Sequence, residues 1–276
     1  MTHDDAWYEQ QYNPRLSVDN VTEIIDSWRK RSVQLRSDLF PMTDFKYGSH
    51  PRENLDLFRA PNAKATLVFI HGGYWRMHSK LETSFIAEHF VARGISVALI
   101  NYPLCPDVTL GDIRDSVLRA FVYLWTRVLN ADERHSIVVS GHSAGGHLAA
   151  LHAAEDWHRR GLPADPIKAV VALSGVFDVS PLLCTSINAD LRLTGDTAEE
   201  LNLLASVPRT TCRMLLAVGD DEPEEFHAQA QHLAKAWGML TSRCESIAGT
   251  NHFTIVDNFA DPASHLHQEV VSLLVS

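Results

Sequence analysis

A serine between glycines is the residue of this chain best suited to covalent chemistry. Residues 141–145 read G-H-S-A-G and fit the pattern G-x-S-x-G. An apolar run at 136–139 precedes the motif, and a helix-like stretch at 144–157 follows it. A sharp strand–turn–helix of this kind exposes a serine hydroxyl, and its small residues let strand and helix approach closely. The motif therefore predicts that Ser143 is a catalytic nucleophile.

A second glycine-rich turn lies 70 residues earlier in the chain. Residues 71–75 read H-G-G-Y-W and directly follow the apolar run at 66–70. Acyl transfer by a serine needs backbone N–H donors aimed at the oxyanion of the tetrahedral intermediate. We expect those donors to be the amides of Gly73 and Ala144, with Gly72 or Tyr74 assisting. His71 is interpreted as a structural residue that fixes this loop.

The general base must come late in the chain, because nucleophile, acid and base follow in that order when a strand–elbow–helix carries the nucleophile. The candidates are His252, His265 and His267. His252 lies in a loop between the last expected strand and the final helix, which favours it. We expect His265 and His267 to fall on a helix and to face solvent.

Three consecutive carboxylates are candidates for the acid that orients the base. Asp220, Asp221 and Glu222 follow Gly219 at the end of an apolar run. The acid commonly stands at the last position of G-x-x-D, and this offset selects Glu222; Asp220 and Asp221 remain the alternatives. The 15 histidines form no H-E-x-x-H or other ligand spacing, so we expect no metal and no cofactor.

The elements that would position these residues alternate between strands and helices. Short, continuous apolar runs predict strands buried on both faces of a parallel sheet. We expect strands at 45–47, 66–70, 97–100, 136–139, 169–173, 214–218 and 243–247, and helices at 21–35, 81–92, 113–129, 144–157, 224–237 and 262–275. This rhythm predicts an α/β-hydrolase fold, a doubly wound and mostly parallel sheet with ligands at the carboxyl ends of its strands.

Composition limits the classes of partner. A formal net charge of −10 argues against nucleic acid or an anionic membrane, so a small-molecule substrate is expected. The first residues do not resemble a signal peptide, no run is long enough to cross a membrane, and the four cysteines form no C-x-x-C. We expect a cytoplasmic protein with free thiols. A homodimer is compatible with the sequence.

The chain reads as a single domain over residues 1–276, without repeats or a linker. Two segments stand outside the alternation of strands and helices. Residues 1–40 are partly helical and precede the first strand, and residues 178–207 separate two central strands. Both segments are candidates for a lid over the strand ends.

Motifs along nearly the whole chain resemble those of the kynurenine formamidases (arylformamidases), which lie near the hormone-sensitive-lipase-like esterases. They are W-Y-E-Q-Q-Y-N at 7–13, Y-G at 47–48, L-D-L-F at 55–58, H-G-G-Y-W at 71–75, G-H-S-A-G-G-H-L at 141–148, S-G-V-F-D at 174–178 and N-H-F at 251–253. The family's G-x-x-D and S-P-E-F frame here reads G-D-D-E-P-E-E-F, which puts Glu222 at the aspartate position.

The resemblance implies hydrolysis of N-formylkynurenine to kynurenine and formate in tryptophan degradation, without a cofactor. It also implies Ser143 and His252 as catalytic residues, with Gly72, Gly73 and Tyr74 as the oxyanion loop. Trp75 and Tyr74 could line an aromatic pocket or pack in the core. Two other functions stay open: a carboxylesterase for short acyl esters with the same machinery, and a binding protein on this fold that has no activity.

Overall fold

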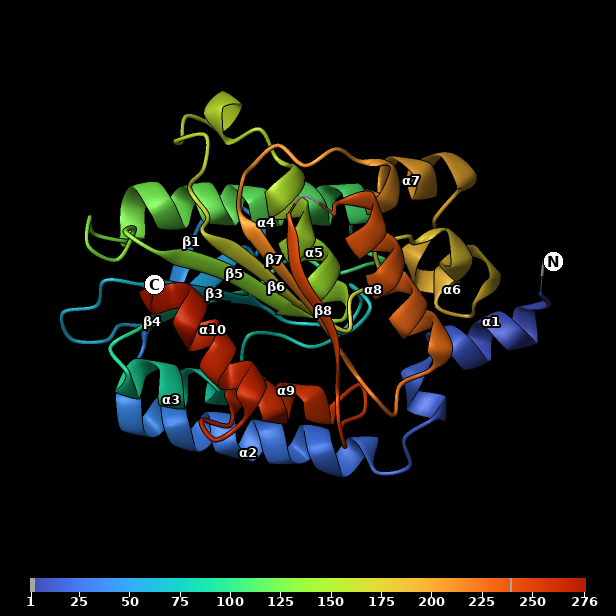
Figure 1. Ribbon diagram of the computed structural model, residues 1–276, viewed down its shortest axis with the longest axis horizontal. Coiled ribbons are helices and arrows are strands. Elements are labelled where there is room, and N and C mark those ends of the chain that lie inside the picture. Colours follow the sequence, from blue (N-terminus) through green and yellow to red (C-terminus); the bar gives the residue numbers. More distant parts are fainter. Residues whose placement is uncertain (1–2, 239) are drawn as a thin grey trace.

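Eight strands form one sheet in the computed structural model, which describes residues 3–238 and 240–276 (Figure 1). The strands are β1 (Met42–Lys46), β2 (Asn54–Phe58), β3 (Thr66–Ile70), β4 (Ser96–Ile100), β5 (Ile137–His142), β6 (Ala169–Leu173), β7 (Arg213–Gly219) and β8 (Thr241–Ile247). Their order across the sheet is β1-β2-β4-β3-β5-β6-β7-β8. The β1–β2 and β2–β4 pairs are antiparallel and the others are parallel.

Helices cover both faces of this sheet. The α-helices are α1 (Asp5–Tyr12), α2 (Val21–Leu39), α3 (Ala87–Ala92), α4 (Leu110–Tyr123), α5 (Ala144–Ala154), α6 (Asn188–Leu191), α7 (Gly195–Glu200), α8 (Glu224–Ala236), α9 (Thr254–Ala260) and α10 (His265–Val275). Figure 1 shows α4, α5 and α8 on one face, and α3, α9 and α10 with α2 on the other.

The continuous apolar runs follow from this double cover. In β3, Val68 and Ile70 pack into the core beneath α4 and α5, whereas Leu67 and Phe69 pack into the core on the opposite face. Successive side chains of a strand point to opposite faces, so a strand covered on both sides has no position for a solvated residue. All five residues of β3 are buried. The predicted fold class is confirmed.

The sequence pattern did not predict strand β2, because a charged residue interrupts its apolar residues. Asp56 lies in the middle of β2 and its side chain is completely buried. Lys80 and Arg36 approach its two carboxylate oxygens at 2.6 and 2.8 Å, and the backbone amide of Asp44 donates to it at 2.8 Å. These partners compensate the free-energy cost of burying the charge of Asp56. Because they are distant in sequence, the residues around Asp56 do not indicate that it can be buried.

Several helix boundaries differ from those expected. The segment expected as one helix over 81–92 contains a 3₁₀ turn, η2 (Ser84–Ile86), and then the short α3. The C-terminal helix begins at His265, after Ser264, whose side chain accepts from the amide of His267. A separate helix, α9, precedes it.

The two segments that lie outside the alternation of strands and helices contain helices and 3₁₀ turns, and no strand among their described residues. Residues 1–40 contain α1, a 3₁₀ turn η1 (Pro14–Leu16) and α2. Residues 178–207 contain η5 (Ser180–Cys184), α6, α7 and η6 (Leu203–Ala205). Two further irregular turns lie elsewhere, the π-helical η3 (Leu124–Val128) and the 3₁₀ turn η4 (Trp157–Arg160). In the part of the chain that the structure describes, no helix is long and apolar enough to span a membrane.

Candidate active site

Ser143 lies in a strained turn between β5 and α5. Its backbone has φ 55° and ψ −120°, a left-handed conformation that L-residues rarely adopt, and its amide donates to the carbonyl of Leu173 at 2.7 Å. A Cβ added at Gly145 would lie 2.0 Å from the carbonyl oxygen of Ile70, so only glycine lets the helix approach β3 this closely. Backbone packing thus keeps the serine at the sharp corner that its motif predicts.

The glycine-rich loop after β3 lies directly beside the serine. A Cβ added at Gly72 would come within 3.1 Å of the Ser143 Cβ. Gly73 and Tyr74 have φ values of 106° and 47°, which turn successive peptide units in this loop. Among the described residues, the amides of Gly73 and Ala144 donate to no acceptor of the chain. Both N–H groups are therefore available to an oxyanion, and that of Ala144 starts α5, where the helix dipole is positive.

His71 anchors this loop, as expected of a structural residue. Its Nδ1 lies 2.8 Å from the carbonyl oxygen of Gly72, and its ring stacks on Tyr102 with centroids 4.2 Å apart. Burial lowers the pKa of His71 to about 3, so the imidazole is neutral and takes no part as a cation. The loop is held from its other end by Tyr74, whose hydroxyl donates to the carbonyl of Tyr12.

The structure brings His252 and Glu222 together. The Nδ1 of His252 and Oε2 of Glu222 are 2.6 Å apart, and both side chains are buried. The other carboxylate oxygen accepts from the amide of Gly219 at 2.7 Å and from the Ser174 hydroxyl at 2.5 Å. With Nδ1 donating to the carboxylate, Nε2 is the ring nitrogen left to accept a proton.

Asp220 and Asp221, the alternative acids, are both exposed. The turn after β7 instead directs Glu222 inward, because its backbone amide donates to the carbonyl of Gly219 while its side chain accepts from the amide of the same residue. A carboxylate with two hydrogen-bond donors on one oxygen has a fixed orientation, which the solvated neighbours lack.

The histidine beside the serine supports the backbone of His252. The Nε2 of His142 lies 2.6 Å from the carbonyl oxygen of His252, and the two rings are 4.8 Å apart between centroids. Burial, with the nearby His252 adding to it, holds the pKa of His142 well below its ordinary value. His142 is therefore a neutral donor that fixes the loop after β8.

The other two candidate bases lie on α10, away from the serine. His265 faces solvent, as expected. The expectation for His267 was wrong: its side chain is fully buried, with Nδ1 3.0 Å from the carbonyl oxygen of Phe259 and its ring 4.3 Å from that of Phe90. It shares a helix face with Val270 and Val271, which pack against the core.

A cavity opens over the serine at the carboxyl ends of the strands. It is bounded by the oxyanion loop, by Ser143 and His252, and by parts of both segments predicted as a lid. Its lining consists of Asn13, Pro14, Arg15, Ile25, Trp28, His71, Gly72, Gly73, Tyr74, Arg76, Met77, His78, Glu82, Thr83, His142, Ser143, Ile187, His252 and Phe253. Of the two aromatic residues left open between pocket and core, Tyr74 lines the cavity and Trp75 is packed in the core. Phe253, from the N-H-F motif, and Trp28, to which no motif pointed, supply further aromatic rings.

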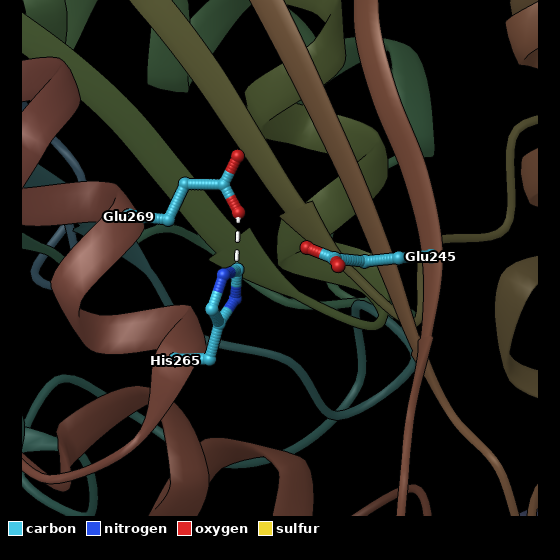
Figure 2. Close-up of side chains that lie close together, drawn as sticks. All are labelled: Glu245, His265 and Glu269. Atoms are coloured by element: carbon cyan, nitrogen blue, oxygen red, sulfur yellow. Dashed lines mark ion pairs between the residues drawn. The ribbon is translucent and has the colours of Figure 1, made fainter.

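Among the described residues, one group of side chains that could hold a metal ion lies outside this cavity. Glu245 of β8 and His265 and Glu269 of α10 point toward one another, with ligand atoms within 4.8 Å (Figure 2). Arg243 already approaches the carboxylates of Glu245 and Glu269 at 3.4 and 3.1 Å. A guanidinium between the two carboxylates supplies the positive charge that a cation would bring. We therefore interpret the group as a surface ion-pair network.

Comparisons with known proteins agree with this geometry. A family model described as BD-FAE matches residues 55–210. Kynurenine formamidase of Salmo salar is 26% identical, covering 96% of this chain and 95% of the relative, and that of Danio rerio is 27% identical, covering 91% and 88%. The similarity to kynurenine formamidases inferred from the motifs is confirmed over nearly the whole chain.

Solved structures extend the comparison. A proposed thioesterase from Silicibacter sp. TM1040 superposes with a TM-score of 0.83 at 28% identity, over all of both chains. Esterase B of Lactobacillus rhamnosus superposes with a TM-score of 0.68 at 17% identity, over 92% of this chain and 94% of the other, and at that identity it shows the fold alone. These neighbours establish the α/β-hydrolase fold, and together with the kynurenine formamidase relatives they establish the general class of enzyme, a hydrolase.

Proposed function

Because the chain belongs to the BD-FAE family and is an α/β-hydrolase enzyme, we propose that it is an arylformamidase that hydrolyses N-formylkynurenine to kynurenine and formate. We further propose Ser143 as nucleophile, His252 as general base and Glu222 as the acid of a catalytic triad. The observation that carries the proposal is the 2.6 Å contact between His252 and Glu222, beside the cavity that Ser143 also lines.

The proposed reaction begins with Ser143. Its hydroxyl oxygen bonds to the formyl carbon while His252 takes the hydroxyl proton at Nε2. The carbonyl electrons move to oxygen, and the amides of Gly73 and Ala144, assisted by Gly72 or Tyr74, stabilise the resulting oxyanion. The C–N bond then breaks as His252 returns its proton to the arylamine nitrogen. Water hydrolyses the formyl-serine ester by the same steps, releasing formate.

Glu222 would act through His252. Its carboxylate accepts the Nδ1 proton, which fixes the tautomer and stabilises the imidazolium that forms during proton transfer. The donors from Gly219 and Ser174 hold the carboxylate in place, so no reorganisation is needed when the charge develops.

Aromatic lining supports an arylamine leaving group. Trp28 and Phe253 lie on the cavity wall, and the Trp28 indole is held by a hydrogen bond of 3.1 Å from Nε1 to Asp257. Their rings lie 6.5 Å apart between centroids. Rigid aromatic surfaces favour the burial of a planar ring beside the scissile bond.

A second candidate function is a carboxylesterase for short acyl esters, which the esterase fold neighbours favour. The two functions share the nucleophile, base and oxyanion loop, and differ in the acyl and leaving groups that the cavity accepts. The third alternative, a binding protein without enzymatic activity, is excluded because the chain is a hydrolase.

The values of kcat/KM for N-formylkynurenine, its N-acetyl analogue and p-nitrophenyl acetate decide between the two functions. We expect N-formylkynurenine to exceed both other substrates by roughly 10-fold or more, since an extra methyl group crowds the acyl position. Efficient cleavage of p-nitrophenyl acetate together with no release of formate from N-formylkynurenine would identify an esterase instead.

We also propose a cytoplasmic location and a small-molecule substrate as the principal partner. The free state of Cys105, Cys184, Cys212 and Cys244 among the described residues supports the location. A homodimer remains compatible with these proposals.

A further inference from the structure

Two arginines line the active-site cavity, and they differ in their partners. Arg76 forms an ion pair of 2.6 Å with Asp190. Arg15, on η1, is exposed and makes no ion pair or hydrogen bond through its side chain within residues 3–238 and 240–276. In a chain with a formal net charge of −10, an uncompensated guanidinium in the cavity that Ser143 also lines is available to an anionic group of the substrate.

Arg15 lines the same cavity as His78, which lies against the oxyanion loop. A Cβ added at Gly73 would lie 2.8 Å from Cδ2 of His78, so this ring packs against the oxyanion loop. His78 has a left-handed backbone (φ 70°) and lines the cavity. Burial lowers its pKa, Glu82 opposes this shift, and the charge of Arg15 contributes to the lowering. The charges of Arg15, Arg29 and Glu82 thus all reach this ring, next to the loop that would hold the oxyanion.

The segment that carries Arg15 is fixed to the body of the protein. The carbonyl of Tyr12 accepts from the Tyr74 hydroxyl, and the Tyr12 hydroxyl donates to Glu225 at 2.8 Å. Glu9 accepts from both the amide and the hydroxyl of Ser186 at 2.8 Å. These contacts join α1 to the oxyanion loop, α8 and the 178–207 segment. Arg15 follows Tyr12 by three residues, so its backbone has a defined position relative to the site.

We propose that Arg15 binds the carboxylate of an amino-acid head group on the substrate, and that the enzyme selects formylated aryl amino acids over neutral formanilides. This inference rests on the proposed arylformamidase function and specifies its substrate class. Glu82, also on the cavity wall, already pairs with Arg29 at 3.7 Å and accepts from the Ser79 hydroxyl at 2.6 Å. The charge of Arg15 is therefore the one that a substrate carboxylate would match.

The test compares kcat/KM for N-formylkynurenine with that for its α-carboxamide, which lacks only the negative charge. In the wild type we expect a ratio of roughly 10–100, the range for one charge-assisted hydrogen-bonded contact, expressed mainly in KM. Arg15→Gln should reduce this ratio to near one, and Arg15→Lys should keep part of it. Arg159→Gln, which removes a charge at an 83% exposed side chain outside the cavity, should keep the full ratio.

A wild-type ratio near one, or a ratio that survives in Arg15→Gln, would overturn the inference. A loss of kcat/KM by equal factors for both substrates would also overturn it, because a merely structural role does not discriminate between them. The neutral substrate 2-formamidoacetophenone separates this failure from that of the proposed function. If the wild type cleaves it, the arylformamidase activity stands without Arg15; if the wild type cleaves no formyl arylamide, both proposals fall.

Discussion

The part of the chain that the structure describes contains two histidine–glutamate pairs, and only one of them has the geometry for proton transfer. His252 and Glu222 are 2.6 Å apart with side-chain exposures of 3% and 0%, whereas His265 and Glu269 are 3.8 Å apart with exposures of 67% and 21%. The residue types are the same. The first pair lies on loops at the carboxyl ends of β7 and β8, and the second lies on successive turns of one surface helix, α10 (Figure 2).

The surroundings of each carboxylate explain the difference. Glu222 accepts from a backbone amide and the Ser174 hydroxyl, so its free oxygen points at the imidazole and water is excluded. Glu269 is shared between His265 and Arg243, in contact with solvent. A buried, preorganised pair can support charge during a reaction, while an exposed pair is screened and contributes little.

The largest expected effect is at the proposed nucleophile and base. Ser143→Ala and His252→Ala should each lower kcat by roughly 10⁴-fold or more, because the two groups act as one unit. His265→Ala should leave kcat near that of the wild type. Steady-state rates with N-formylkynurenine, with circular dichroism to verify folding, measure this contrast. A damaging His265→Ala together with an active His252→Ala would reverse the assignment of the two pairs.

The acid should give the next largest effect. Glu222→Ala removes the acceptor for Nδ1 of His252 and should cost on the order of 10²–10⁴ in kcat with little change in KM. Asp220→Ala and Asp221→Ala should cost far less, since both residues are exposed. Measuring kcat and KM of the three variants under the same conditions tests this difference. If one of the aspartates proves essential and Glu222 does not, the contact seen at His252 is not the functional one.

Buried histidines should make the folded state sensitive to acid. Burial lowers the pKa of His147 and of His152 to about 4, and both rings are inaccessible to solvent. Unfolding restores the ordinary pKa of about 6.5, so between pH 6.5 and pH 4 the unfolded state binds protons that the folded state does not. The contribution of each histidine is therefore complete above about pH 6.5 and is lost as the pH falls toward 4.

Urea unfolding at pH 7.5 and 5.5 measures this loss, which should be about 1.4 kcal/mol for each such histidine over that interval. His152→Gln should reduce the dependence of the free energy of unfolding on pH by about this amount. His265→Gln, at an exposed position, serves as the matched control and should leave the slope as it is. An equal reduction in both variants would show that burial is not the cause.

The smallest effect is expected at the surface network. Glu269→Ala should change the free energy of unfolding by less than about 1 kcal/mol, because its partners Arg243 and His265 are both exposed. Activity should stay at the wild-type level. The same urea titrations give the value, and a loss above about 3 kcal/mol would mean that this pair is as tightly coupled as a buried one.

The parts of the site that sequence could predict are those set by local geometry. The serine, the glycine loop and Glu222 each follow a strand end within a few residues, and a single turn determines where each of them points. At Glu222 the reason is explicit, because the three-residue offset from Gly219 lets the amide of that glycine bind the side-chain carboxylate. Chain order then distinguished His252 from the histidines of the last helix.

The remaining features depend on contacts distant in sequence. β2 is stabilised by the ion pairs of Asp56 with Lys80 and Arg36. No pattern of residues near Asp56 predicts these pairs. Trp28 and Arg15 reach the cavity only because the N-terminal segment folds across the strand ends. His267 could have been placed correctly, since Val270 and Val271 lie three and four positions later on the same helix face.

The most direct test of the account is the site of covalent labelling by a fluorophosphonate probe, mapped by peptide mass spectrometry. A single adduct on Ser143 is predicted, absent in Ser143→Ala, formed much more slowly in His252→Ala, and formed at the wild-type rate in His265→Ala. An adduct on a different residue, or labelling of His252→Ala as fast as that of the wild type, would contradict the proposal that Ser143 and the buried His252–Glu222 pair form the catalytic centre.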